Sequence, residues 1–173
     1  MWKLEGLDEY DIRRPMTPTG TNLLGLVKHS AGELFLYFGD VFGRPQDPWL
    51  PWMADGSEPN ADMWATPDET RESIVARYRQ TWELADTTID ELPLDAPGQV
   101  WWWGDDPVTL HRVLVHVTAN TQRHAGHADI IRESIDGSVG LLEASDNLRI
   151  QDAAAWQTLH DRIEEAARLA TRR

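Results

Sequence analysis

The segment TNLLGLVKHSAGELFLYFGDVF, residues 21–42, decides the fold class, because its core-type positions recur at alternating spacings of four and three. This spacing returns side chains to one side of an α-helix. The positions on that side are Leu23, Val27, Ser30, Leu34, Phe38 and Val41. We therefore predict an amphipathic helix that begins at an N-cap, Thr21, and stops at Gly43.

Two longer segments downstream have the same periodicity. Residues 66–92 open with a capping box, TPDE, whose proline occupies the first helical position, and apolar residues then follow at helical spacing. A third helix is predicted from about Val108 to Ile135, where the dipeptide DG at 136–137 ends it. Both segments therefore favour long helices.

The last segment, residues 152–170, is rich in alanine and predicts a fourth helix with Asp152 as its cap. No strand alternation, internal repeat or low-complexity tract is visible along the chain. Four amphipathic helices must bury their apolar faces against one another. We therefore predict an all-α protein, an antiparallel four-helix bundle with long crossover loops, as a single domain over residues 1–173.

Two connectors between the predicted helices are rich in Pro, Gly and Trp. The first, GRPQDPWLPWMADGSEPNADMW (43–64), should be a long ordered loop that has no regular element of its own and covers other parts of the fold. The second, LPLDAPGQVWWWGDDP (92–107), contains Trp101, Trp102 and Trp103, which cannot all face one side. At least one of these rings, with Trp102 as our candidate, should line a loop surface or a pocket mouth.

Composition narrows the classes of function. The 29 acidic and 16 basic residues leave a formal charge of −13, which repels nucleic acids and anionic membrane surfaces. Cysteine is absent, so a metal site has to use His, Asn, Asp or Glu. No apolar run has the length of a membrane span, and the first residues lack the order of a signal peptide. We expect a cytoplasmic protein that binds neither nucleic acid nor membrane.

The core-facing side of the third predicted helix is polar in its middle. Its positions are Val113, Val117, Asn120, His124, His127 or Ala128, Ile131 and Ile135. A buried amide or imidazole without a partner costs roughly 1–3 kcal/mol, so hydrogen bonds or a metal should satisfy these groups. The helix at 21–42 has a matching feature in His29, with Glu33 at helical spacing from it. Two facing helices that each direct an imidazole inward can build a metal site.

Other interpretations of these polar residues stay open. A single inward histidine is more often a hydrogen-bonded core residue than a metal ligand. His116 and His127 can orient a ligand or lie at a pocket rim, and Glu33 can be an acid, a base or part of a solvated helix face. His111 and His160 have no such neighbours, which favours a surface position. The spacing predicts a histidine-lined, metal-binding pocket and names no reaction.

Four motifs spread through nearly the whole chain: TPTGTNLLGLVKHSAGE (17–33), YFGDVFGRP (37–45), VTLHRVLVHV (108–117) and QRHAGHADIIRESIDG (122–137). Together they resemble the DinB-like superfamily, and within it the actinobacterial branch that includes mycothiol S-transferases. The resemblance implies a DinB-type four-helix bundle with a divalent metal, zinc or nickel. The ligands in such proteins are one His on an early helix, and a His or Glu plus a His four residues later on a later helix. A mycothiol-like thiol is implied as cosubstrate.

Two ligand positions of the family match histidines of this sequence. His29 corresponds to the early-helix ligand and His124 to the last ligand of the later helix. Metal-binding relatives have Glu or His four residues before the latter, whereas this chain has Asn120. An amide oxygen is a neutral and weaker ligand, so we expect a loosely held metal, or completion of the site by His127 or water. The candidate set is His29, His124, His127 and Asn120 for the metal, with His116, Glu33 and Trp102 at the pocket.

The beginning of the chain also departs from the family. Relatives have a complete helix before the segment that resembles WKLEGLDEYDIRRP (2–15), and this chain begins where that helix would be ending. An apolar stripe left uncovered favours association with another chain, so we expect a homodimer.

The function that combines these inferences is a metal-dependent S-transferase that conjugates a mycothiol-like thiol to a small electrophile. Two alternatives stay open. A degenerate metal site would leave a small-ligand binding or interaction module, and a metal that activates water would make a hydrolase. Metal content, thiol conjugation and thiol-independent hydrolysis distinguish the three.

Overall fold

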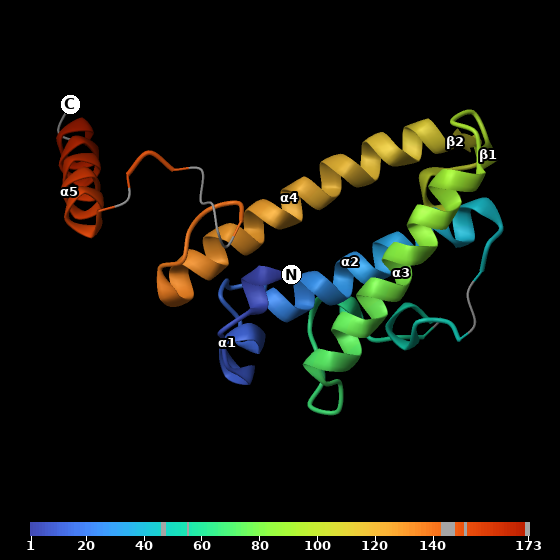
Figure 1. Cartoon of the computed structure of the whole chain (residues 1–173), viewed down its shortest axis with the longest axis horizontal. Helices are drawn as coiled ribbons and strands as arrows, with labels where there is room; N and C mark the ends of the chain where they lie inside the picture. Colours follow the sequence, from blue (N-terminus) through green and yellow to red (C-terminus); the bar gives the residue numbers. More distant parts are fainter. Residues whose placement is uncertain (46–47, 55, 143–147, 151, 172–173) are drawn as a thin grey trace. The chain divides into compact units, whose positions relative to one another are not determined.

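The computed structural model describes residues 1–173 apart from 46–47, 55, 143–147, 151 and 172–173. The chain divides into two compact units, Met1–Ser138 and Val139–Arg173. Helices are the main elements of both units, which confirms the all-α class (Figure 1). Within the described ranges, no helix combines the length and apolar character needed to cross a membrane.

Three long helices form the body of the first unit in its described part (Figure 1). Helix α2 (Leu23–Phe38) packs against both α3 (Arg71–Glu91) and α4 (Leu110–Asp136). A short 3-10 turn, η1 (Trp2–Leu4), and a short helix, α1 (Glu9–Arg13), precede α2 and contact it. The central position of α2 means that its side chains meet neighbours on several sides.

Helix α2 begins one residue later than the sequence predicts. Its N-cap is Asn22, whose Oδ1 accepts a hydrogen bond from the Gly25 N–H at 2.8 Å, so Thr21 is not the cap. The amide of Asn22 also donates to the Met63 carbonyl at 3.2 Å. Gly25 allows this close approach, since a Cβ there would lie 1.9 Å from the same carbonyl oxygen. The cap therefore joins the start of α2 to the loop before α3.

The predicted start of α3 is wrong by one helical turn. The capping-box hydrogen bond does form, from the Thr66 N–H to Glu69 Oε2 at 2.8 Å. However, the same oxygen accepts from Lys28 Nζ at 2.8 Å, which ties Glu69 to α2. The helix begins at Arg71, and Thr70 is its N-cap. A tertiary ion pair thus competes with the local helix signal.

The two connectors contain more regular structure than the sequence predicts. The loop after α2 includes the 3-10 turns η2 (Asp40–Phe42), η3 (Pro51–Met53) and η4 (Ala61–Met63), so the prediction of a loop without regular elements is wrong. The connector before α4 has the turn η5 (Trp101–Trp103) between strands β1 (Pro97–Gly98) and β2 (Val108–Thr109). These strands pair antiparallel, with Pro97 opposite Thr109 and Gly98 opposite Val108. Strands of two residues are too short to show alternation in the sequence.

Buried apolar side chains gather at the two ends of the helix packing. One cluster joins the end of α2 to the start of α4 through Tyr37, Phe38, Val113 and Val117. The other joins the start of α2 to the end of α4 through residues that include Leu23, Leu24, Leu26 and Ile131, and it also contains Leu4 and Ile12 of the first residues. The middle of both helices lies between these clusters and is polar.

In the second unit, helix α5 spans Ala153–Ala170. The prediction of Asp152 as its cap is confirmed, because this side chain accepts a hydrogen bond from the Ala155 N–H at 3.0 Å. Its residues are exposed or half-buried within the unit, with Trp156 and Ile163 among the exposed ones. The packing of this helix into a four-helix bundle stays a prediction.

Arg132 on α4 holds the first residues of the chain. It is 7% exposed, and its guanidinium donates to the carbonyls of Trp2, Lys3 and Glu5 at 2.8–3.2 Å. Asp136 pairs with the same guanidinium at 2.8 Å. The hydrogen bond from Arg132 lowers the pKa of Asp136 from 3.8 to about 2, against the opposing effect of burial. This ion pair therefore orients the arginine that anchors the N-terminal segment.

We expect Asp136→Asn to lower the free energy of unfolding at pH 7 by roughly 1–2 kcal/mol, after allowance for solvent screening of a partly exposed pair. A carboxyl with a lowered pKa stabilises the folded state above its unfolded pKa. The difference between variant and parent should therefore shrink as the pH falls from about 4 to about 2. Urea unfolding across this range measures it, and a pH-independent difference would contradict the assignment.

Candidate metal centre

The antiparallel contact of α2 with α4 sets three pairs of polar residues opposite one another. On α2 the positions follow each other at intervals of four, and on α4 at intervals of four in the reverse direction. We call these three pairs the polar seam: His29 with His124, Glu33 with Asn120, and Tyr37 with His116. The ring centroids of the first pair lie 4.7 Å apart and those of the last 5.0 Å apart. In the middle pair, the Asn120 amide donates a hydrogen bond to Glu33 Oε1.

His29, Glu33 and His124 converge at one end of the seam. Each offers a ligand atom, and these atoms all lie within 4.8 Å of one another. Nε2 of His29 lies 3.3 Å from Glu33 Oε1, and Nε2 of His124 lies 3.8 Å from Glu33 Oε2. Two imidazoles and one carboxylate are a common protein donor set for zinc and related divalent ions.

The hydrogen bonding of His124 fits a metal-binding role. This side chain is buried, and in the described part of the chain its Nδ1 has no hydrogen-bond partner. The 3.8 Å between its Nε2 and Glu33 is too long for a direct hydrogen bond. A buried imidazole that makes no hydrogen bond is costly unless it is coordinated, so these residues fit a divalent metal ion.

His29 is oriented by a residue of the loop before α3. Its Nδ1 lies 2.5 Å from Oδ2 of Asp62, which belongs to η4, and its Nε2 therefore faces Glu33. The turn is held on α2 next to this pair, because Lys28 Nζ donates to the Trp64 carbonyl at 2.9 Å. A carboxylate that accepts from one nitrogen of a histidine fixes the ring and makes the other nitrogen a better ligand.

The two histidines of the centre have opposite pKa shifts. Burial lowers the pKa of His29, but hydrogen bonds to Asp62 and Glu33 and their charges outweigh it and raise the pKa to about 9. Burial lowers the pKa of His124, and the charge of Glu33 opposes this shift. At neutral pH without metal, His29 is therefore protonated and His124 neutral. A metal that binds His29 Nε2 must displace a proton.

The structure places the other predicted site residues around this cluster. His127 is exposed, and its ring lies 5.6 Å from that of His124 but outside the converging group. Asn120 lies in the middle of the seam. His116 contacts the Trp103 ring at 4.5 Å, and Trp102 contacts Tyr37 at 5.3 Å. Which of these residues bind a metal stays a prediction.

Two residues of the site were not identified from the sequence in the roles that the structure indicates. Asp62 lies in a loop, where no periodicity indicates which way a side chain points. The sequence offers one signal for it, which is that a loop of this length is expected to cover other parts of the fold. Glu33 was placed at the pocket as one of many helix carboxylates, yet it lies between the two histidines. Its spacing of four from His29 was a signal, although amphipathic helices carry many such pairs.

The far end of the seam is aromatic. Tyr37 is buried beside Trp102 and Trp103 of η5, whereas Trp101 is exposed, as expected for three rings that cannot face one side. Burial raises the pKa of Tyr37, and hydrogen bonds with Trp102 and Trp103 oppose this shift. The Tyr37 hydroxyl therefore stays protonated at neutral pH.

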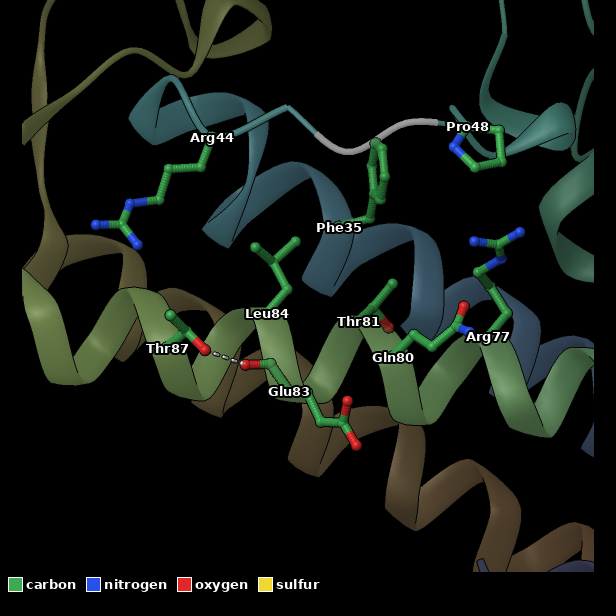
Figure 2. A pocket seen from close by; sticks show the side chains of 9 residues that line it. All are labelled: Phe35, Arg44, Pro48, Arg77, Gln80, Thr81, Glu83, Leu84 and Thr87. Atoms are coloured by element: carbon green, nitrogen blue, oxygen red, sulfur yellow. Dashed lines mark hydrogen bonds between the residues drawn. The ribbon is translucent and has the colours of Figure 1, made fainter.

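A cavity of about 560 Å³ lies away from the seam, between α3 and the loop after α2 (Figure 2). Figure 2 shows Arg44 and Arg77 near its two ends, with Leu84 and Thr81 of α3 between them. Phe35 reaches it from the opposite side of α2 to Glu33, and none of the seam residues lines it. The candidate centre is therefore defined by its donor geometry, not by this cavity.

Fold and site together define an all-α helical protein with a candidate divalent-metal centre between two antiparallel helices. The family model described as mycothiol-S-transferase matches residues 1–137, and the chain belongs to this family. The resemblance noted from the sequence is thereby confirmed. The match covers all but the last residue of the first unit. No curated protein matches the chain.

We expect Asp62→Asn to move the pKa of His29 from about 9 back toward 6.5 in metal-free protein, because the variant loses a negative hydrogen-bond partner. NMR titration of the imidazole nitrogens measures this shift. Asp129→Asn is the control and should leave the His29 pKa unchanged. It also removes a carboxylate, but one that pairs with Lys3 at 2.8 Å. An unchanged His29 pKa in Asp62→Asn would contradict the orienting role of Asp62.

Proposed function

We propose that this protein is a metal-dependent S-transferase that conjugates a mycothiol-like thiol to a small electrophile. The observation that carries the proposal is the convergence of ligand atoms from His29, Glu33 and His124 within 4.8 Å, in a chain of the mycothiol-S-transferase family. Zinc or nickel fits this donor set. A cytoplasmic location and a homodimer are parts of the same proposal.

His29, Glu33 and His124 would hold the ion. Bound there, a divalent ion supplies Lewis-acid chemistry, which lowers the pKa of a thiol and stabilises the thiolate, the nucleophilic form. Glu33 contributes a single negative charge and the two imidazoles bind as neutral ligands, so the loaded centre keeps a net positive charge. That charge favours an anionic sulfur over a neutral one.

Other residues of the chain would prepare the centre for the thiol. Asp62 fixes the ring of His29, so that its Nε2 faces Glu33. His127, which is exposed one helical turn along α4 from His124, would accept the proton that a thiol releases. The aromatic rings of Trp102 and Trp103 line the far end of the seam, where they offer an apolar surface for an electrophile.

The protein loaded with zinc or nickel should conjugate mycothiol to a bimane electrophile faster than the uncatalysed reaction. Loss of a residue that only supports a ligand typically costs about 10–100-fold in metal affinity or activity. Glu33→Gln and His124→Ala each remove a ligand itself, so each should lower the rate by more than about 100-fold. Fluorescence of the conjugate measures the rate, and Asp129→Asn serves as the matched carboxylate control. No acceleration with any low-molecular-weight thiol would overturn the proposal.

The same preparations distinguish the two alternative functions. Fewer than about one metal per ten chains after incubation with zinc and nickel would favour a binding module with a degenerate site. Asn120 motivates this alternative, since it presents an amide where a carboxylate would bind metal more strongly. Hydrolysis of a small amide and ester panel without thiol would favour a metal-dependent hydrolase.

A further inference from the structure

In the middle pair of the polar seam, Asn120 binds one of the two carboxylate oxygens of Glu33. Oε1 accepts the hydrogen bond from the Asn120 amide and lies 3.3 Å from His29 Nε2. Oε2 lies 3.8 Å from His124 Nε2. Both side chains of the pair are partly buried, with that of Glu33 16% exposed. The two oxygens therefore have different surroundings, and only one of them is bound to Asn120.

An amide at position 120 suits this arrangement better than a carboxylate or an apolar side chain. A second carboxylate there would face Glu33 at hydrogen-bonding distance, and like charges at that distance repel. An apolar side chain would leave the Glu33 carboxylate free to rotate, and ordering a flexible Glu side chain costs conformational entropy. The N–H groups of an amide donate to Glu33 without adding charge.

We propose that Asn120 is a positioning residue for the metal centre. It binds Glu33 Oε1 and thereby holds the carboxylate with Oε1 near His29 Nε2 and Oε2 toward His124 Nε2. The acidic ligand is then supplied by α2, four residues after His29, and not by α4. Asn120 acts through Glu33 and is not itself a ligand. The inference rests on the metal centre of the proposed function, and it does not depend on which reaction that centre catalyses.

A double-mutant cycle on metal affinity tests this role. The variants are Asn120→Leu, Glu33→Gln and the double variant, and the dissociation constant for zinc is measured by competition with a chromophoric chelator. Asn120→Leu should weaken zinc binding by about 10–100-fold, as expected when the partner of a ligand is removed. In the Glu33→Gln background the same change should matter by less than about threefold, because residues that act through one another are not additive.

Gln122→Leu provides the matched control. It removes an exposed amide from the same helix, two residues further along, and should leave the zinc affinity unchanged. The absorption spectrum of bound cobalt gives a second readout that is independent of activity, and it should change in Asn120→Leu and in Glu33→Gln. If Asn120→Leu does not fold, as judged by circular dichroism, Asn120→Ala takes its place in the cycle.

Each outcome decides between distinct conclusions. Equal zinc affinity for Asn120→Leu and the parent overturns the positioning role and leaves the metal centre standing. An equal loss in both backgrounds also overturns it, since Asn120 would then act independently of Glu33, as a ligand does. A parent protein that binds no zinc overturns the inference together with the metal centre. Coupled zinc binding without any S-transferase activity supports the inference and overturns the proposed function alone.

Discussion

The register of α2 against α4 is the constraint on which the candidate centre depends. Residues 29, 33 and 37 run along one helix while 124, 120 and 116 run back along the other, so each polar residue meets a polar partner. A displacement of one helical turn, about 5.4 Å, would break all three pairs at once. The two apolar clusters oppose such a shift, because each joins one end of α2 to the opposite end of α4.

Burial of polar side chains in the middle of α2 and α4, between the two apolar clusters, costs desolvation free energy. Tertiary contacts satisfy most of these polar groups. His29 forms a hydrogen bond with Asp62, and Glu33 forms one with Asn120. The buried ammonium group of Lys28 donates to Glu69 and to a backbone carbonyl. His124 differs from them, since its Nδ1 has no partner in the described part of the chain. Unsatisfied buried groups concentrate at functional sites, where stability is given up for binding.

The loop before α3 belongs to the site as much as the helices do. Asn22 and Lys28 of α2 bind the carbonyls of Met63 and Trp64, and these contacts hold the turn that carries Asp62 against His29. The turn η4 therefore has two roles: it binds the N-cap of α2, and it carries the carboxylate that orients His29. The loop packs so closely against α2 that position 25 has no room for a side chain, which explains the glycine there.

The sequence by itself determined the helices and pointed to two members of the candidate centre. Helical periodicity located α2, α3 and α4 to within about a turn, because amphipathic spacing depends only on neighbours along the chain. The polar interruption at Asn120 and His124 was visible for the same reason, and His29 followed from the facing helix. Family membership, inferred from motifs on and beside α2 and α4, was confirmed by the match over residues 1–137.

Only the tertiary structure decided how the polar residues combine. Glu33, Asn120 and Asp62 are far apart in the sequence, and their contacts depend on the helix register and on the loop, which no local pattern encodes. The start of α3 likewise departs from the local signal, two residues after Glu69, whose carboxylate pairs with Lys28. Periodicity records which face a residue occupies, whereas the partner it meets there is set by the packing of the whole unit.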